Sequence, residues 1–485
     1  MKKIKDEVNR VILDVTGQPL AELLLLDKQI MISYSWLKFM IKTDDYYDVK
    51  GKNNMFYKIK NFCTESYVTI NNIFEQYGGK IIFLLLFLQA LKLFLLYRTC
   101  GIIDEVDTNS YVEPAKMFLQ TGRMLWGGVP TPIRTPGYIL FLATIYKVFG
   151  EQNGIVIFLQ CIMCLLNSYM LFYCIKKITR NAFLAVIAVF FYTMDLAVYF
   201  SALSIMTDVF FSFLLLASVT CFIKWMYEKK LCYFLYAIII VNYALLVRPQ
   251  LMYLSILFVF VLFAGSSIKR IPWKATFFYL CCFSIVFGGW SMRNYKEYGK
   301  FTYTTIRDVN IFAFDAMLTY SMKEGVSEEE ASIAMNNKLY QAYPEIDSMK
   351  YMEQLNAKKE VGNTYLKENF GYYILVNLKG LETEMVAPGM TGISKLNLPE
   401  AVKKVIAILH GGLLLVSYFI YGFYFLKNFC KLKVIDWMIF VIAAYLMASS
   451  ASVGYSRFRL SFYPFVLLGG FILKEKKTPI VINKE

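Results

Sequence analysis

Long apolar runs are the feature of this sequence that most narrows what the chain can fold into. A helix needs about 20 apolar residues to cross the hydrocarbon core of a bilayer, and runs of that kind recur from residue 81 onwards. Hydrophobic residues make up 57% of the 485 positions and aromatic residues 17%, which is unusual for a soluble globular protein. The sequence therefore predicts an all-α polytopic membrane protein. The ten expected spans cover residues 81–97, 154–175, 181–203, 207–226, 231–247, 251–267, 273–292, 403–426, 434–454 and 459–473.

One apolar segment is too short to be counted with these spans. Residues 137–150, GYILFLATIYKVFG, offer about 14 residues, a length that suits an interfacial or re-entrant helix. If this segment does not cross, all the short loops rich in Lys and Arg fall on one side of the membrane, as cytoplasmic loops do. We therefore expect a multi-pass protein with both termini in the cytoplasm. The basic loops are residues 176–180, 224–230, 269–274, 427–433 and 474–477.

This topology divides the chain into four parts. Residues 1–79 form an N-terminal cytoplasmic extension, and residues 80–292 form a transmembrane module whose first outer loop is 98–153. Residues 293–402 are polar, with helix-like spacing in SEEEASIAMNNKLYQAYP, and predict an extracytoplasmic helical loop domain. Residues 403–485 supply the last transmembrane helices and a basic tail. The frequent Lys, Asn and Ile favour a bacterial plasma membrane.

The charge and the rare residue types limit the chemistry. Lys and Arg number 51 against 36 Asp and Glu, for a net charge of +15, which indicates an anionic partner such as nucleic acid, phosphate or lipid headgroups. In a membrane protein we expect phosphate and lipid, and no nucleic acid. The only histidine is His410, which excludes Ser-His-Asp triads and multi-histidine metal sites. Carboxylates must therefore carry any acid–base work.

Two groups of acids are expected on the outer side. Asp107 stands four residues before Tyr111 on one face of a short amphipathic helix, and Asp104 and Glu105 lie close to it. Asp208 stands at the outer mouth of a predicted span, where an ionisable side chain is a functional candidate. Both aspartates also suit helix capping, so this structural interpretation stays open for each.

Five arginines are predicted at the same level as these acids. Short outer loops of membrane proteins are usually poor in arginine, so arginines at these positions indicate a specific role. The planar guanidinium suits phosphate and carboxylate groups, although snorkelling to lipid headgroups or pairing with the acids would explain any one of them. As a group they favour an outer anionic ligand. They are Arg134, Arg248, Arg293, Arg457 and Arg459.

In this order, the motifs resemble the GT-C fold membrane glycosyltransferases, in particular the protein mannosyltransferase and aminoarabinose transferase branch. The resemblance covers roughly residues 80–475. Five patterns carry it, and each is loose alone. They are D-x-x-x-Y-x-x-x-A at Asp107, Tyr111 and Ala115; P-x-x-R-x-P-G-Y around Arg134, Pro136, Gly137 and Tyr138; [TS]-[DE] at Thr207 and Asp208; W-x-x-R-N-Y-x-x-x-G at Trp290, Arg293, Asn294, Tyr295 and Gly299; and R-[FY]-R-x-x-x-x-P at Arg457, Phe458, Arg459 and Pro464.

The resemblance implies roles for these residues. Asp107 would be the catalytic base, and Asp208 a second catalytic acid that assists or holds a divalent ion, Mg²⁺ or Mn²⁺, with Asp107. Tyr111, Tyr138 and Glu105 would position the substrate. The donor phosphate would be bound by Arg134, Arg248, Arg293, Arg457 and Arg459. Relatives often carry Glu-Arg-Tyr where this chain has Ser456, Arg457 and Phe458, and the extension before residue 80 has no counterpart in the family.

The activity implied is the transfer of a sugar from a polyprenyl-phosphate donor to a hydroxyl of a glycan, lipid or protein acceptor on the extracytoplasmic face. The chemistry agrees with the residue types. Polyprenyl phosphate is a fair leaving group, so the reaction needs a base for the acceptor and cations for the phosphate. Direct displacement would invert the anomeric centre. The alternatives are a transporter or flippase of a lipid-linked sugar and a non-catalytic scaffold.

Overall fold

The computed structural model describes residues 54–130, 132–269 and 271–474. The predicted N-terminal extension up to residue 53 and the basic tail from residue 475 lie outside the described residues, as does Arg270. The chain divides into two compact units, Met1–Tyr67 and Val68–Glu485. The second unit holds all the predicted site residues.

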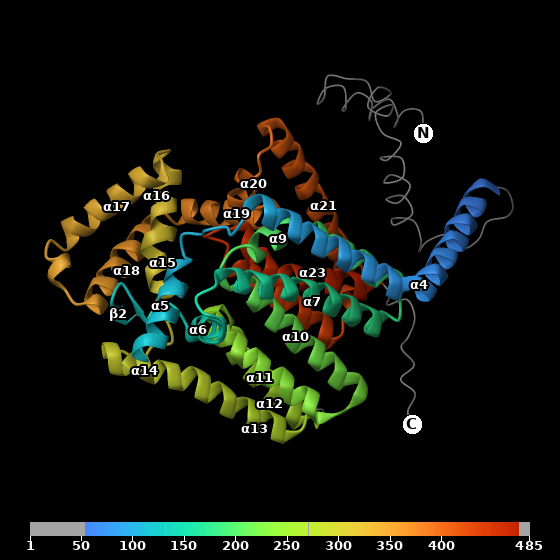
Figure 1. Cartoon of the computed structure of the whole chain (residues 1–485), viewed down its shortest axis with the longest axis horizontal. Coiled ribbons are helices and arrows are strands. Elements are labelled where there is room, and N and C mark those ends of the chain that lie inside the picture. The colour runs from blue at the N-terminus through green and yellow to red at the C-terminus, as the bar shows by residue number, and fades with distance from the viewer. Residues whose placement is uncertain (1–53, 131, 270, 475–485) are drawn as a thin grey trace. The chain divides into compact units, whose positions relative to one another are not determined.

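The described chain is almost entirely helical (Figure 1). The helices of the transmembrane module and first outer loop are α4 (Asn54–Cys100), α5 (Asn109–Thr121), α6 (Pro136–Phe149), α7 (Asn153–Thr179), α8 (Ala182–Met194), α9 (Leu196–Ala202), α10 (Thr207–Glu228), α11 (Leu231–Val247), α12 (Met252–Ser267), α13 (Trp273–Phe283) and α14 (Gly289–Tyr298). Those of the following region are α15 (Ile306–Asn310), α16 (Met317–Glu324), α17 (Glu328–Ala342), α18 (Tyr351–Glu368), α19 (Phe370–Val386) and α20 (Met390–Ser394). The last three are α21 (Glu400–Lys427), α22 (Val434–Ala448) and α23 (Arg459–Lys474).

Short elements complete the secondary structure. Strands β1 (Leu125–Trp126) and β2 (Val129–Pro130) form an antiparallel pair. The 3₁₀ segments are η1 (Pro249–Leu251), η4 (Ile346–Ser348), η5 (Phe429–Lys431) and η6 (Ser456–Phe458), and the π-helical segments are η2 (Ser284–Gly288) and η3 (Ile311–Ala316).

The helices confirm the predicted class of an all-α polytopic membrane protein, but the count of ten spans is not confirmed. Six helices among the described residues are long and apolar enough to cross a membrane, or seven if a bent pair counts as one span. The predicted spans 231–247 and 434–454 are shorter helices of 17 and 15 residues. The predicted span 459–473 is the 16-residue helix α23, whose first fifteen residues are buried against neighbours such as α21 and α22.

The predicted span 181–203 is not one straight helix. It breaks between α8 and α9, which meet at an angle of 61°. The break falls at Asp195, whose side chain accepts a hydrogen bond from the amide of Ala197 at 3.0 Å and so caps α9. An aspartate that caps a new helix competes with continuation of the old one. The chain therefore bends at Asp195, between the apolar helices α8 and α9.

The short segment expected at 137–150 is the 14-residue helix α6. It packs against α5 and α11, and Gly137 touches the backbone of α11 closely. A Cβ atom at this position would lie 2.6 Å from the carbonyl carbon of Leu246, so only glycine allows the contact. The predicted non-crossing topology of this segment stays a prediction.

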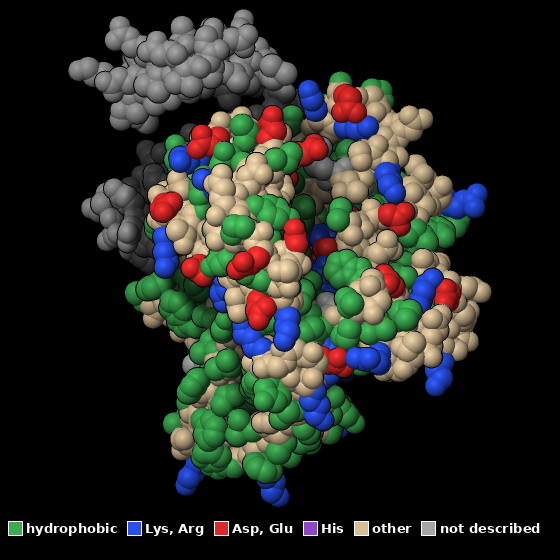
Figure 2. Space-filling view, turned by 90° about the vertical axis from the view of Figure 1, so that its left-hand side faces the viewer, with side chains coloured by type: hydrophobic (Ala, Val, Ile, Leu, Met, Phe, Trp, Pro, Cys, Tyr) green, Lys and Arg blue, Asp and Glu red, His purple; other side chains and the backbone are tan. Residues whose placement is uncertain are grey.

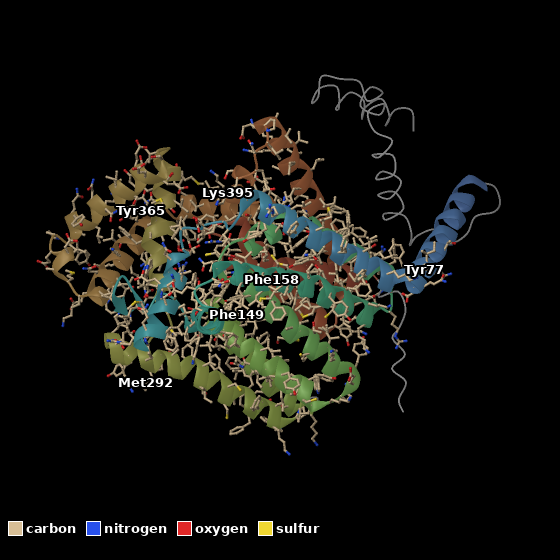
Figure 3. All side chains as sticks on the ribbon, in the orientation of Figure 1. Tyr77, Phe149, Phe158, Met292, Tyr365 and Lys395 are labelled. Atoms are coloured by element: carbon tan, nitrogen blue, oxygen red, sulfur yellow. The ribbon has the colours of Figure 1, made fainter. Side chains whose placement is uncertain are left out.

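Residues 306–386 include a helical region with its own small core, and its expected extracytoplasmic location stays a prediction. The core joins η3, α17 and α18 through side chains that include Phe312, Met335 and Leu339. The start of α17 is fixed by a capping box, in which Ser327 and Glu330 satisfy each other's amides. Tyr365, labelled in Figure 3, lies at the edge of this core on α18. Acidic and basic side chains intermingle on the upper part of the face seen in Figure 2, while its lower part is mostly apolar.

Candidate active site

Asp107 is held between two arginines that come from distant parts of the chain. Its Oδ1 lies 2.6 Å from a terminal nitrogen of Arg134, and its Oδ2 lies 3.3 Å from one of Arg457. The carboxylate keeps 37% of its side-chain surface accessible, against 14% for each arginine. Asp107 is therefore the most exposed member of this group and the one that a substrate could reach.

The turn before α5 presents Asp107 in this position. The main-chain carbonyl of Asp107 accepts hydrogen bonds from the amide and the hydroxyl of Ser110, at 3.0 and 2.6 Å. Through these bonds only the main chain of Asp107 contributes to the start of α5. The N-cap residue is Thr108, whose side chain makes no capping hydrogen bond. The side chain of Asp107 therefore does not cap the helix, because its carboxylate faces Arg134 and Arg457.

Arg134 is positioned by the loop that leads into α6. Its Nε donates to the hydroxyl of Ser110 at 2.9 Å, and its guanidinium lies 4.8 Å from the ring centre of Tyr111. The loop itself is tied to α11, because the Thr135 hydroxyl donates to the carbonyl of Val247 and the Tyr243 hydroxyl to that of Gly137. The R-x-P-G-Y segment, residues 134–138, thus fixes Arg134 beside the end of α11.

The end of α11 carries the second arginine. Arg248 follows directly after Val247, and its terminal nitrogen lies 2.9 Å from Oδ1 of the buried Asp208. Asp208 stands in the first turn of α10, where the helix dipole favours a negative charge. The N-cap of α10 is Met206, without a side-chain cap, so Asp208 serves as the partner of Arg248 and not as a cap.

The third arginine is brought in by η6, near the C-terminus. The ring of Phe458 lies between two guanidinium groups, 4.9 Å from that of Arg248 and 5.4 Å from that of Arg457. Arg457 also reaches Glu105, at 3.6 Å. Burial raises the pKa of Glu105, and the charge of Arg457 opposes that rise. Phe458 therefore stacks beside both cations and keeps them adjacent.

These six residues form what we call the acid–arginine cluster. Three formal negative charges face three positive ones, in a region assembled from segments that are up to 350 residues apart. Several guanidinium nitrogens of the cluster, Arg248 Nη1 and Arg457 Nε and Nη1, are buried and have no acceptor within hydrogen-bond distance among the described residues, although Arg457 Nη1 lies 3.6 Å from Glu105. Buried donors without acceptors are costly and ask for an explanation. The cluster members are Glu105, Asp107, Arg134, Asp208, Arg248 and Arg457.

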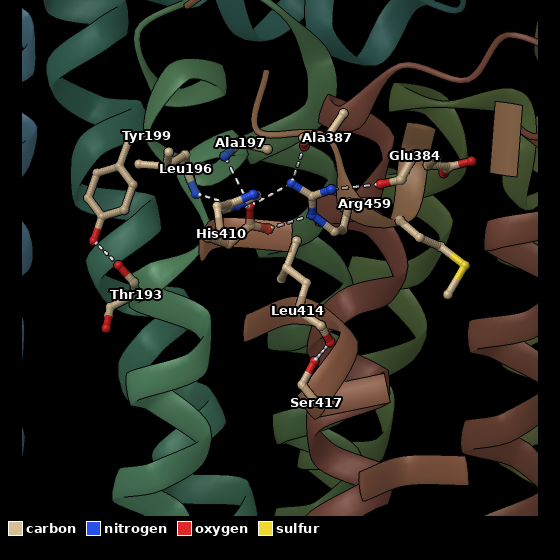
Figure 4. A network of polar contacts seen from close by, with 12 residues as sticks. Thr193, Leu196, Ala197, Tyr199, Glu384, Ala387, His410, Leu414, Ser417 and Arg459 are labelled. Carbon is tan, nitrogen blue, oxygen red and sulfur yellow. Dashed lines mark hydrogen bonds and ion pairs between the residues drawn. The ribbon is translucent and has the colours of Figure 1, made fainter. Parts of the chain in front are cut away.

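Arg459, predicted to bind phosphate, is placed elsewhere. Its side chain is completely buried and pairs with Asp195 through two hydrogen bonds, 2.9 and 2.7 Å long. Two further donors go to the carbonyls of Glu384 and Ala387, at 2.7 and 2.9 Å (Figure 4). The bonds leave this guanidinium little capacity for a ligand. Its geometry supports a structural role that joins α9, α19 and α23.

The partners of Arg459 were not predicted from the sequence. Asp195 lies in the apolar run FYTMDLAVYF, where a charged residue was a signal that could have been followed. His410 approaches Asp195 Oδ1 to 3.1 Å, and its Nε2 lies at the same distance from the amide of Leu196. These contacts attach α21 to the α8–α9 break, so the single histidine of the chain is used for packing and polar satisfaction.

The remaining predicted residues lie at or beyond the edge of the cluster. Tyr111 supports Arg134 with its ring and packs edge-on against Tyr138. Tyr138 is fully buried and donates to Gln160, whose amide in turn binds two carbonyls near the start of α10. Arg293 contacts the side chains of Asn294 and Trp290 on its own helix, α14. Tyr111 and Tyr138 can position Arg134, whereas Arg293 lies on a separate element.

The residues offer a poor cage for a divalent cation. Asp107 and Asp208, the expected ligands, each face a guanidinium group. Within residues 54–130, 132–269 and 271–474, no group of three or more His, Cys, Asp or Glu is spaced to hold a metal ion. The donor set suits an anion better than Mg²⁺ or Mn²⁺. No cofactor was assigned from the sequence, a Mg²⁺ or Mn²⁺ ion held by Asp107 and Asp208 stays untested, and no step of the proposed reaction is assigned to a metal.

Glu384 is a second buried acid that sequence analysis missed, and it predicts a pH effect on stability. Its Oε1 accepts from the Ser450 hydroxyl at 2.7 Å, while Oε2 is buried without a hydrogen bond from the described residues. Burial raises the pKa of Glu384 from 4.5 to about 8, against the opposing effects of Ser450, Arg459 and Arg248. The folded protein therefore holds this proton at pH values where the unfolded chain has released it.

Stability should consequently fall as the pH rises from about 4.5 to about 8, and level off above that value. Glu384→Gln should weaken this dependence and raise the melting temperature at pH 8, because a neutral amide replaces the proton-dependent carboxyl. Thermal unfolding in detergent between pH 5 and 9 measures it. Glu382→Gln, at an exposed position of the same helix, should keep the original slope. An unchanged slope in Glu384→Gln would contradict the assignment.

Comparison with known proteins agrees with the class of enzyme predicted from the motifs. Residues 133–288 match the family described as dolichyl-phosphate-mannose-protein mannosyltransferase, and this segment includes Arg134, Asp208 and Arg248. The match supports a GT-C-type glycosyltransferase. A search of curated proteins gave no match.

Two solved structures are similar at the level of a loose superposition. ArnT from Cupriavidus metallidurans in the apo state is 11% identical, covers 79% of this chain and 76% of its own, and has a TM-score of 0.37. The same protein bound to undecaprenyl phosphate is 11% identical, with coverages of 81% and 77% and a TM-score of 0.36. Likenesses at this TM-score do not pair individual residues between the chains.

Proposed function

We propose that this protein transfers a sugar from a polyprenyl-phosphate donor to an acceptor hydroxyl, and that the acid–arginine cluster binds the donor phosphate. The observation that carries the proposal is that Arg134 and Arg457 both pair with the accessible Asp107, while Arg248, paired with Asp208, contacts the same Phe458 ring as Arg457. Guanidinium groups bind phosphate through paired hydrogen bonds. Two of them beside one reachable carboxylate, with a third in the same cluster, supply both requirements of the reaction, a base and a site for the leaving phosphate.

The nature of the donor follows from the setting of the cluster. The apolar helices place the chain in a membrane, and the description of the matching family names a sugar linked to dolichyl phosphate, which is a polyprenyl phosphate. The unsatisfied donors of Arg248 and Arg457 are suited to phosphate oxygens. In the cluster those arginines face carboxylates. The phosphodiester of the donor carries one negative charge, as a carboxylate does, and the polyprenyl phosphate that leaves gains a second one, so the leaving group would compete best for the arginines.

In the proposed reaction, Asp107 accepts the proton of the acceptor hydroxyl as its oxygen bonds to the anomeric carbon. The bond from that carbon to the phosphate oxygen breaks, and its electron pair stays on the leaving polyprenyl phosphate. Arg134 and Arg457 would stabilise the charge that develops there. Attack from the face opposite the phosphate inverts the anomeric centre. For Asp107 to act as the base, the donor phosphate must draw the arginines away from it.

Asp208 has a different part in this proposal. Its side chain is completely buried and faces Arg248, so it acts by holding that arginine and not by touching the acceptor.

We further propose that the termini are cytoplasmic and that the cluster faces the extracytoplasmic side, since this topology puts the basic loops on the cytoplasmic side. The acceptor, whether glycan, lipid or protein, is left to experiment.

Arg457→Ala should raise the KM for the donor and lower transfer by about ten-fold or more, because one of the cations that stabilise the leaving group is lost. Purified protein in vesicles, with a radiolabelled polyprenyl-phosphate sugar and membrane-derived acceptors, measures both values. Arg457→Lys should recover part of the loss, as it keeps the charge without the planar fork. Arg123→Ala, which removes an exposed partner of Glu297, is the matched control. Equal KM values in Arg457→Ala and the control would refute the phosphate assignment.

A flippase of lipid-linked sugars remains the second candidate, and one observation favours it. The break between α8 and α9 inside the apolar region is a feature typical of transporters. The same vesicles distinguish the two functions. A glycosyltransferase releases the labelled sugar from its phosphate onto the acceptor, whereas a flippase moves the intact lipid between leaflets.

A further inference from the structure

Helix α19 carries an exposed apolar stripe in the region expected to be an extracytoplasmic domain. Phe370, Ile374, Leu375 and Leu378 recur at the spacing of one helix face and expose 60%, 44%, 51% and 56% of their surface. We call these four residues the α19 stripe. A contiguous apolar surface on a water-facing helix would be costly, which suggests that this face has a partner.

Another face of α19, beside the stripe, is tightly packed and fixes which way the stripe points. Gly380 lies against the backbone at Ala451, so close that a Cβ atom there would overlap the Ala451 carbonyl oxygen. Four residues later, Glu384 accepts from Ser450. Since Gly380 and Glu384 occupy the packed side, rotation about the helix axis is set, and the stripe faces away from the protein.

The C-terminal end of α19 reaches the apolar part of a predicted membrane span. Val386 lies against Gly411 of α21, and the carbonyl of Met385 accepts from the Tyr418 hydroxyl at 3.2 Å. Lys404 is the last charged residue before the apolar run of α21. Gly411 follows it by seven residues, so it lies about 10 Å further along the helix. Leu378 is eight residues from Val386, about 12 Å. The stripe therefore ends near bilayer depth at any tilt of α19.

The neighbouring surface of α21 has the same character. Val405, Ile408 and Leu409 expose 54%, 72% and 69% of their surface and belong to a helix that passes the criteria for a membrane span. Lys379 and Tyr372 border the stripe on α19, and such residues are common at membrane interfaces. Exposed apolar side chains thus occur both on the span α21 and on α19, which meet at Gly411 and Val386.

From these contacts we propose that the α19 stripe is inserted into the membrane interface and binds bilayer lipid. Residues 370–386 then anchor the helical region to the leaflet on its own side, and lipid contact begins before residue 403. Because Glu384 and Ala387, next to the end of α19, bind Arg459 through their carbonyls, this anchor is joined to the helices that carry the cluster. The lipid contact does not depend on the proposed sugar transfer.

Photocrosslinking tests it directly. The full chain is reconstituted in nanodiscs of radiolabelled phosphatidylglycerol and phosphatidylethanolamine, with photoreactive benzoylphenylalanine in place of Leu375. Ile333, equally exposed at 58% but isolated on α17, is the matched control, and Phe277, exposed at 69% on the span Trp273–Tyr298, is the positive control. All three positions are on the surface, so the substitutions should not disturb folding.

Irradiation should label the protein with lipid at position 375 several-fold more than at position 333, and at a level comparable to position 277. Labelling at 375 no stronger than at 333 would overturn the proposal. A crosslinked dimer without lipid labelling would also overturn it and assign the stripe to a second copy of the chain. Neither result would bear on sugar transfer, which needs the labelled donor.

Discussion

Asp107→Asn is expected to abolish sugar transfer, with a fall of about 100-fold or more, because an amide cannot take the proton of the acceptor hydroxyl. The change is nearly isosteric, and Asp107 is partly exposed, so insertion and yield should be unaffected. Transfer of label from a polyprenyl-phosphate sugar, in vesicles with matched amounts of protein, measures the effect. The KM for the donor should change far less than kcat.

The matched control is Asp104→Asn, three residues earlier in the same loop. Asp104 is exposed and has no ion pair among the described residues, so its variant should transfer at the original rate. Retained transfer in Asp107→Asn would remove the base from the mechanism. Loss in both variants would point to a general effect of loop charge and not to proton transfer at Asp107.

Asp195→Ala should give the largest loss of stability. It removes the only carboxylate that faces Arg459 in this part of the described chain and leaves a fully buried guanidinium unpaired. Breaking a buried ion pair from one side costs about 3–5 kcal/mol. The variant should therefore yield little folded protein or melt at a clearly lower temperature in detergent, as followed by thermal unfolding.

Two further variants serve as controls for the stability loss expected in Asp195→Ala. Glu297→Ala breaks the exposed pair with Arg123 and should cost about 0–1 kcal/mol. The double variant Asp195→Leu, Arg459→Met removes both buried charges and should recover part of the lost stability, since apolar side chains of similar volume often replace a buried pair. A melting temperature for Asp195→Ala equal to that of Glu297→Ala would rule out a stabilising role for the pair.

The residues of the cluster were predicted one by one, but their partners were not. Asp107, Arg134 and Arg457 each stood in a motif, and the sequence offered the interpretation that arginines pair with the acids. The motifs did not indicate that Arg248 pairs with Asp208 or that Arg134 pairs with Asp107. The close packing at Gly137 places the loop of Arg134 beside the end of α11, which Arg248 follows, and this contact between distant segments is not visible in the motifs.

Arg457 and Arg459 show most clearly where local patterns stop being informative. They are two residues apart in one motif, and both were predicted to bind phosphate. The chain turns from η6 into α23 between them, so one guanidinium reaches Asp107 and the other is buried on Asp195. Their chemistry is identical, and only the direction of the backbone separates their roles.

The amino-acid sequence by itself determined that this chain is helical and belongs in a membrane, because the length and apolarity of a segment are local properties. It also supplied the acids and arginines that any anion chemistry would use. The tertiary structure decided which charges meet, where the span at Asp195 bends, and which face of α19 is left apolar and exposed. Those outcomes depend on contacts between segments far apart along the chain, whose free energies no single segment contains.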